Sequence, residues 1–173
     1  MYLNMIFRKS TTEDIPAIME IVRDAQEALQ NLGINQWQNG YPSVSVIEND
    51  IAGGNSYVLF RDDKIVATAA VLFSGEPTYA DIHNGAWITD DDYAVVHRLA
   101  VKRQYKQAGT ASFLMDNIED MVIDYGMRSI RIDTHEGNIP MRGLLQKKGY
   151  KVCGIIYLAD GNQRVALEKV LGE

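Results

Sequence analysis

The stretch Leu99–Met115, LAVKRQYKQAGTASFLM, is the most informative part of this chain. It starts at the end of an apolar, strand-like run (Val95–Val101), passes through a short basic loop, and enters a helix whose first turn contains only small residues. The N-terminus of a helix carries unpaired backbone N–H groups and a partial positive charge, so it attracts anions. Small residues let a phosphate approach the backbone, and Lys102, Arg103 and Lys106 add positive charge. The stretch therefore predicts a phosphate or pyrophosphate site.

The composition is typical of one globular domain spanning residues 1–173, with 46% apolar and 23% charged residues. Seventeen basic and 23 acidic side chains give a net charge of −6, which disfavours general nucleic-acid binding. The single cysteine, Cys153, excludes an intrachain disulfide and suits a reducing compartment. The sequence begins without the apolar core of a signal peptide and contains no run long enough to span a membrane. We therefore expect a cytoplasmic protein with neither a nucleic-acid nor a membrane partner.

The hydrophobic pattern predicts a mixed α/β domain with the element order βααβββαβαββ. Strands are predicted at Met5–Arg8, Tyr57–Phe60, Ile65–Leu72, Ala94–Val101, Ser129–Thr134, Tyr150–Leu158 and Arg164–Val170. Helices are predicted at Thr12–Asn31, Ser43–Ala52, Gly109–Tyr125 and Ile139–Lys148. A capping-box pattern over Ser10–Glu13 marks the start of the first helix, and Ser74–Asp92 is predicted to be irregular and acidic.

The segment Lys106-Gln107-Ala108-Gly109-Thr110-Ala111, between a strand and a helix, resembles the signature Gln/Arg-x-x-Gly-x-Gly/Ala of the GNAT N-acetyltransferase superfamily. The segment differs only at the first position, where lysine keeps the charge but not the planar fork of arginine. The resemblance extends over nearly the whole chain and implies acetyl-coenzyme A (acetyl-CoA) as co-substrate, with no metal. The cofactor-binding residues that it implies are Leu99, Ala100, Val101, Lys106, Gln107, Ala108, Gly109, Thr110, Ala111 and Asn138.

A second segment, from Asn138 to Tyr150, resembles the downstream motif of the same superfamily, Asn…Leu-Tyr-x-Lys-x-Gly-Phe. The resemblance implies that Asn138 and the following helix lie against the pantetheine arm, and Asn138 also suits a helix N-cap. Leu145 stands where the family has the tyrosine that donates a proton to the departing thiolate. Leucine cannot donate. Because a CoA thiol has a pKa of about 8.5, like cysteine, the thiolate can leave with help from water or backbone dipoles.

His97 is the candidate general base, because an ammonium acceptor must lose a proton before it attacks a thioester. The run from His97 through Leu99-Ala100-Val101 resembles the serotonin acetyltransferase branch, which has a catalytic histidine at this position. Strand alternation would also place His97 on the same face as Val95 and Leu99, so a packed structural histidine is the alternative. For His135 we expect a hydrogen bond that stabilises a turn, and a catalytic role is the alternative. The resemblance places a backbone oxyanion donor near Ala100 or Val101.

Aromatic and acidic residues mark the expected acceptor side. No Lys or Arg occurs between Lys64 and Arg98, whereas the acidic residues there are Glu76, Asp81, Asp90, Asp91 and Asp92. Aromatic rings and carboxylates together suit an ammonium group. We therefore predict that the acceptor is bound by Trp37, Tyr41 and Tyr79, the alternative being a solvated acidic loop.

These observations predict an N-acetyltransferase that moves the acetyl group of acetyl-CoA to a primary amine, of a small molecule or a peptide, by direct attack. The alternative is an acyl-CoA-binding sensor without catalytic activity. The chain also resembles a bacterial subgroup of the superfamily, and the resemblance implies a homodimer. Cys153 lies in a predicted strand and is not expected to act as a nucleophile.

Overall fold

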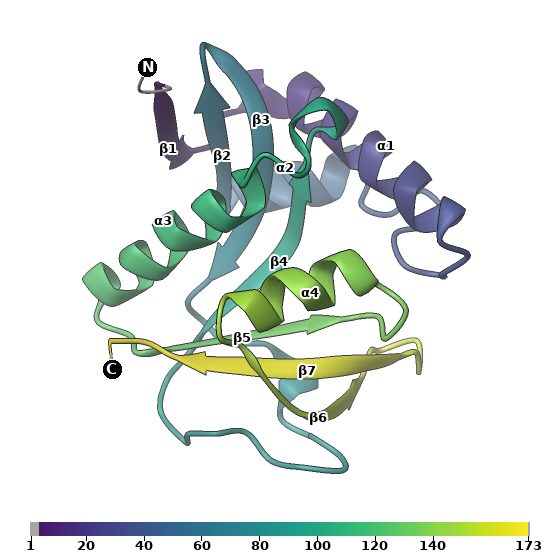
Figure 1. Ribbon diagram of the computed structural model, residues 1–173, viewed down its shortest axis with the longest axis vertical. Helices are drawn as coiled ribbons and strands as arrows, with labels where there is room; N and C mark the ends of the chain where they lie inside the picture. The colour runs from purple at the N-terminus through teal and green to yellow at the C-terminus, as the bar shows by residue number, and fades with distance from the viewer. Residues whose placement is uncertain (1–3, 173) are drawn as a thin grey trace. The chain divides into compact units, whose positions relative to one another are not determined.

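The computed structural model describes residues 4–172, and within that range the predicted order of strands and helices is confirmed. The elements are β1 (Met5–Lys9), α1 (Ile15–Asn31), α2 (Val44–Ala52), β2 (Ser56–Arg61), β3 (Lys64–Leu72), β4 (Ala94–Val101), α3 (Thr110–Tyr125), β5 (Ser129–Thr134), α4 (Ile139–Lys147), β6 (Lys151–Tyr157) and β7 (Gln163–Val170), as labelled in Figure 1. Three short 3-10 turns are η1 (Thr12–Asp14), η2 (Pro77–Tyr79) and η3 (Arg103–Tyr105). The strands form a 7-stranded mixed sheet in the order β1-β2-β3-β4-β5-β7-β6.

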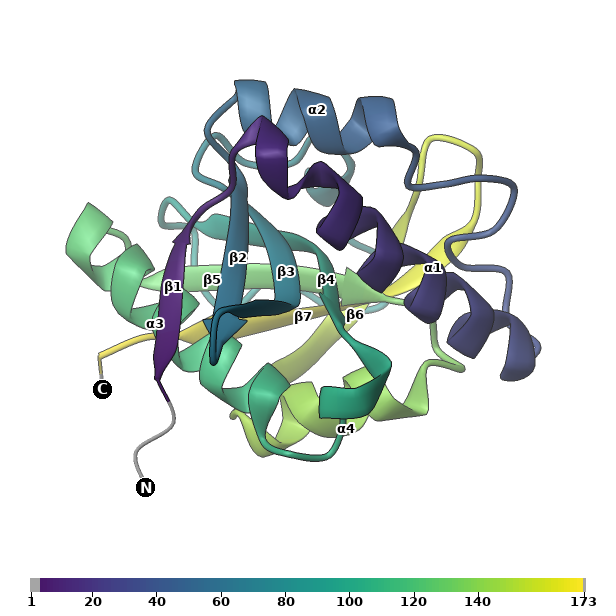
Figure 2. The same cartoon turned by 90° about the horizontal axis from the view of Figure 1, so that it is seen from above.

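The chain divides into two compact units, residues 4–71 with 98–117 and residues 72–97 with 118–172. In the first unit β1, β2 and β3 pair antiparallel. Helices α1 and α2 pack against these strands through a core of Ile18, Val22, Ile47 and Val58, and Figure 2 shows both helices beside β2. The apolar residues whose spacing predicted α1 therefore form the face that this helix buries.

The start of α1 differs from the expected pattern. The capping box is formed by Thr11 and Asp14, not by Ser10–Glu13, because the chain first makes the 3-10 turn η1. The carboxylate of Asp14 accepts a hydrogen bond from the Thr11 backbone N–H at 2.7 Å. It also pairs with Arg8 at 2.8 Å, and this hydrogen bond is the main reason that the pKa of Asp14 lies below its ordinary value.

In the second unit the first part of β4 runs parallel to β5, with Ala94 opposite Ile130 and Val95 opposite Arg131. Strand β7 then pairs antiparallel with both β5 and β6. A core of Tyr79, Val95, Ile156 and Ala166 lies between the sheet and the segment 73–93. None of the helices in residues 4–172 is both long and apolar enough to cross a membrane.

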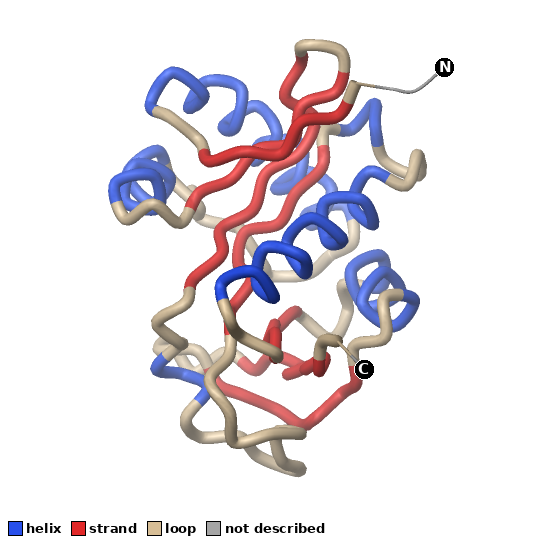
Figure 3. Tube along the Cα trace, turned by 90° about the vertical axis from the view of Figure 1, so that its left-hand side faces the viewer, coloured by secondary structure: helices blue, strands red, loops and turns tan. Residues whose placement is uncertain are grey.

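The segment 73–93 joins β3 to β4, and Figure 3 colours most of it as loop. It is nevertheless fixed to β6, because His83 and Ile155 exchange two backbone hydrogen bonds of 2.8 Å. Two glycines permit this approach. A Cβ atom at Gly85 would lie 1.8 Å from the carbonyl oxygen of Cys153, and one at Gly154 would lie 2.5 Å from that of His83.

Candidate active site

An ion pair between His97 and Glu76 lies in the second unit. His97 is near the middle of β4, and Glu76 is the N-cap of η2, where its carboxylate accepts hydrogen bonds from the backbone N–H and hydroxyl of Thr78. The Nε2 atom of His97 lies 2.9 Å from Glu76 Oε2, and the two side chains are 20% and 21% exposed. The hydrogen bond with His97 is the main reason that the pKa of Glu76 falls to about 2. An ionised Glu76 accepts a hydrogen bond from the Nε2–H group, and in the neutral form of the ring this leaves the lone pair on Nδ1.

Tyr79 differs from what the sequence predicted. We expected its ring to contact the acceptor, but its side chain is 1% exposed and its hydroxyl donates to Asp133 at 2.6 Å. Burial is the main reason that the pKa of Tyr79 is well above its ordinary value. Its ring meets His97 edge-on at 6.2 Å between centroids. Tyr79 therefore links η2, β4 and β5 from inside the unit.

A second buried cluster accounts for two other aromatic rings of the segment 73–93. The guanidinium of Arg131 lies 4.4 Å from the ring centre of Trp87 and 4.0 Å from that of Tyr93, so these rings already hold a cation. Glu168, with no exposed surface, pairs with Arg131 at 3.2 Å. The other groups that donate to the Glu168 carboxylate are the backbone N–H of Ile88 and the hydroxyls of Thr89 and Ser129.

The residues that follow β5 include the predicted turn and cap. The backbone N–H of Gly137 donates to His135 Nδ1 at 2.9 Å, which confirms the expected turn hydrogen bond. Asn138 is the N-cap of α4 and accepts from the backbone N–H of Met141. Leu145 has no exposed surface and belongs to the core. The position of the family tyrosine is therefore part of the packing, and it offers no hydrogen-bond donor.

The predicted cofactor loop lies in the first unit. It leaves β4 at Lys102, forms η3, and has two left-handed residues, Gln107 (φ 66°) and Gly109 (φ 75°), before α3 begins at Thr110. The hydroxyl of Thr110 donates to the carbonyl of Tyr105 at 3.0 Å and closes the loop. Residues 106–109 are exposed. Left-handed turns of this kind leave backbone N–H groups free to bind an anion.

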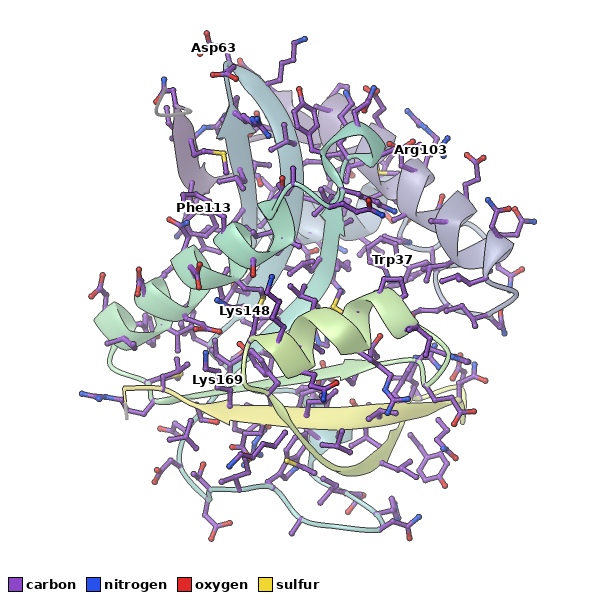
Figure 4. The ribbon with its side chains drawn as sticks, in the orientation of Figure 1. Trp37, Asp63, Arg103, Phe113, Lys148 and Lys169 are labelled. Carbon is purple, nitrogen blue, oxygen red and sulfur yellow. The ribbon has the colours of Figure 1, made fainter. Side chains whose placement is uncertain are left out.

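The three cations of the loop differ in their partners. Lys102 pairs with Glu20 at 3.1 Å, and Arg103 pairs with Glu27 at 2.7 Å beside α1, where Figure 4 labels it. These two cations are therefore paired with carboxylates of α1. In the part of the chain that the structure describes, no carboxylate pairs with Lys106.

Arg98 lies next to His97 within β4 and has an unusual backbone conformation. Its φ of 52° is left-handed, so the regular alternation expected between His97 and Leu99 does not hold. The Arg98 guanidinium donates two hydrogen bonds of 2.6 Å to the carboxylate of Asp50 in α2. It donates a third, of 3.0 Å, to the hydroxyl of Tyr41. Tyr41 is 43% exposed, so its ring stays available to a ligand although its hydroxyl is engaged.

Trp37 lies in the same unit, on the loop after α1, and it is half-buried with a φ of 60°. Trp37 and Tyr41 therefore belong to one loop, as predicted. Leu99 is half-buried and Ala100 and Val101 are buried in β4. Their predicted contacts with acetyl-CoA stay predictions.

Comparison with known proteins assigns the family. A model of the acetyltransferase (GNAT) family matches residues 16–150, which is most of the chain. The chain belongs to the GNAT acetyltransferase family. A GNAT-family acetyltransferase from Streptococcus agalactiae is 30% identical, with a TM-score of 0.90, and the match covers 100% of this chain and 99% of that one. None of the curated proteins compared with this GNAT member is similar enough to count as a relative.

More distant structures share the fold. A GNAT-family acetyltransferase from Listeria monocytogenes has a TM-score of 0.74 at 17% identity, and the match covers 99% of both chains. The PaiA N-acetyltransferase from Thermoplasma acidophilum, solved with coenzyme A, has a TM-score of 0.73 at 17% identity, with 96% of this chain and 99% of that chain covered. At such identities the likeness concerns the fold alone.

Proposed function

We propose that this GNAT acetyltransferase moves the acetyl group of acetyl-CoA to a primary amine by direct attack, with His97 as the general base. The observation that supports the proposal best is the 2.9 Å pair between His97 Nε2 and Glu76 Oε2. A carboxylate on one imidazole nitrogen fixes the tautomer and stabilises the imidazolium that forms when the other nitrogen takes a proton.

In the proposed reaction, different residues of the chain act on the amine, the pyrophosphate and the acceptor. Acetyl-CoA supplies an acyl thioester, which an uncharged amine attacks without a covalent enzyme intermediate. His97 Nδ1 takes the proton of the amine, Glu76 holds the ring, and Tyr79 packs against its edge. The loop residues 106–109 and the N-terminus of α3 hold the pyrophosphate through backbone N–H groups, with Lys106 as the available cation. The acceptor contacts Trp37 and Tyr41.

The proposal is tested by thiol release from acetyl-CoA with a panel of primary amines. The rate of the wild-type protein should fall at low pH as His97 gains a proton, and His97→Ala should flatten this acid limb without changing the Kd for acetyl-CoA. Glu76→Gln removes the carboxylate that orients the His97 ring, so it should lower the rate of thiol release without changing the Kd for acetyl-CoA. Asp81→Asn, at an exposed position of the same segment, should change neither the rate nor the Kd.

The outcomes separate the two candidate functions. Tight acetyl-CoA binding without thiol release for any amine would favour the sensor over the enzyme. An acid limb that is the same in the wild-type protein and in His97→Ala would remove His97 as the base while leaving the transfer itself in place.

A further inference from the structure

The side chain of Thr134 carries an unsatisfied polar group. Among the buried side-chain atoms of residues 4–172, its hydroxyl oxygen is the one without a hydrogen-bond partner. Thr134 is the last residue of β5 and is 1% exposed. A buried hydroxyl without a partner is costly, and native proteins satisfy nearly all such groups with protein, water or ligand atoms. The protein supplies none here, so a ligand or a water molecule must.

The neighbours of Thr134 in β5 indicate where the hydroxyl points. Side chains alternate between the two faces of a strand. The side chain of Asp133 binds the Tyr79 hydroxyl, and Arg131 packs on Trp87, so both lie on the face that carries the segment 73–93. Thr134 therefore points to the opposite face, together with the buried residues Ile130 and Ile132 of the same strand.

His97 is linked to Asp133, the residue before Thr134. The pairs described between β4 and β5 are Ala94 with Ile130 and Val95 with Arg131, so Val95 and Arg131 each lie two residues before His97 and Asp133. Tyr79 joins these positions directly, because it donates to Asp133 and its ring meets His97. The proposed base is thus linked through Tyr79 to the residue that precedes Thr134 in β5.

We propose that Thr134 donates a hydrogen bond to the sulfur of coenzyme A as the acetyl group leaves. This inference rests on the proposed function. As the amine nitrogen bonds to the acyl carbon, the carbon–sulfur bond breaks, its electron pair moves to sulfur, and the amine proton goes to His97. Thr134 keeps its own proton and stabilises the thiolate through the hydrogen bond. Such a bond to a charged acceptor is stronger than one to a neutral thioester sulfur, so it favours departure.

The test measures the thiol pKa of bound coenzyme A, which requires no knowledge of the acceptor. The thiolate is followed by its ultraviolet absorbance during a pH titration, and the same titration with desulfo-coenzyme A subtracts the protein, including Cys153. In the wild-type protein the pKa of the bound thiol should lie below that of free coenzyme A. Thr134→Val should raise it by about one unit, because a hydrogen bond to a charged group is lost. Thr134→Ser should keep it low.

Stability gives a second readout. Thr134→Val replaces an unsatisfied hydroxyl with a methyl group of the same shape, so the ligand-free variant should melt at or above the wild-type temperature. Should Thr134→Val fail to fold, Thr134→Ala serves for the titration. Equal thiol pKa values in the wild-type protein and the hydroxyl-free variant, with coenzyme A bound to both, would overturn the role of Thr134 alone. Absence of coenzyme A binding to the wild-type protein would overturn the proposed function, and this inference with it.

Discussion

The loop between β4 and α3 and the segment between β3 and β4 are both irregular and polar, but they use their polar groups differently. In the segment 73–93 the carboxylate of Glu76 is paired with His97, and the carboxylate of Glu168 binds two of its residues from within the core. In the loop the cations at its start are paired with α1, while residues 106–109 are exposed. Charged groups therefore fix the segment 73–93 to the rest of its unit, whereas the loop leaves backbone N–H groups available to an anion.

The difference shows that a polar residue indicates function through its partners, not through its type. The acidic segment suggests a cation site from composition alone, yet its aromatic rings hold Arg131. The loop contains three cations, yet two of them are paired. Four measurements test whether the two regions differ in this way.

The largest effect is expected at Glu168, the anchor of the segment. Glu168→Ala leaves Arg131 and three further donors without their acceptor, and removing one partner of a buried ion pair costs about 3–5 kcal/mol. Thermal unfolding should shift down by about 10 °C or more. Asp91→Ala, at an exposed position of the same segment, should leave the melting temperature nearly unchanged. A small shift for Glu168→Ala would mean that the segment is held by other contacts.

Gly109→Val tests the loop. Because φ at Gly109 is 75°, a β-branched residue must distort the backbone that is proposed to bind the pyrophosphate, and the Kd for acetyl-CoA should rise more than about tenfold. Calorimetry gives the Kd. Gly126→Val is the matched control, since φ there is 102°, at the far end of α3. Similar losses of affinity in both variants would indicate general destabilisation.

Lys106→Ala removes the cation of the loop that has no ion pair in the described chain. An exposed charge contributes about 0.2–1 kcal/mol, so the Kd for acetyl-CoA should rise up to about fivefold, and less at high salt. Lys64→Ala, at the exposed first residue of β3, should have no effect on the Kd. An unchanged Kd in the Lys106 variant would leave pyrophosphate binding to the backbone alone.

The smallest effect concerns the pH dependence of stability. Since the pKa of Glu76 is lowered from 4.5 to about 2 in the folded protein, its ionised form stabilises the fold. This contribution is complete above about pH 4.5 and disappears as the pH falls to about 2. The difference in melting temperature between the wild-type protein and Glu76→Gln should therefore shrink over that range. A difference that does not vary with pH would show that the pair with His97 adds no stability.

The strands and helices were predictable because their hydrophobic periods are clear. Strands β4 and β5 occupy the predicted residues, and the helix ends differ by one residue or by a 3-10 turn such as η1. The Asp62-Asp63 turn, with φ values of 49° and 63°, joins the predicted hairpin β2–β3. Local periodicity and turn residues carry this information directly.

The partners of the site residues were not predictable in the same way. Glu76 and His97 are 21 residues apart and meet only because η2 folds back beside β4, and Asp50 reaches Arg98 from 48 residues away. In the sequence Glu76 is one of five acidic residues between Lys64 and Arg98, and that pattern does not indicate a histidine partner. Tyr79 was assigned to the acceptor because composition does not show whether an aromatic ring is buried.

The backbone bridge between His83 and Ile155 has a consequence for solubility. Strand β6 ends the sheet order, so its outer edge presents N–H and C=O groups that could recruit a strand from another molecule. The bridge occupies part of that edge, and the bare Cα atoms of Gly85 and Gly154 let it come close enough to do so. The segment that carries Glu76 thus also covers part of the outer edge of β6, and a side chain at residue 85 would clash with the backbone of that strand.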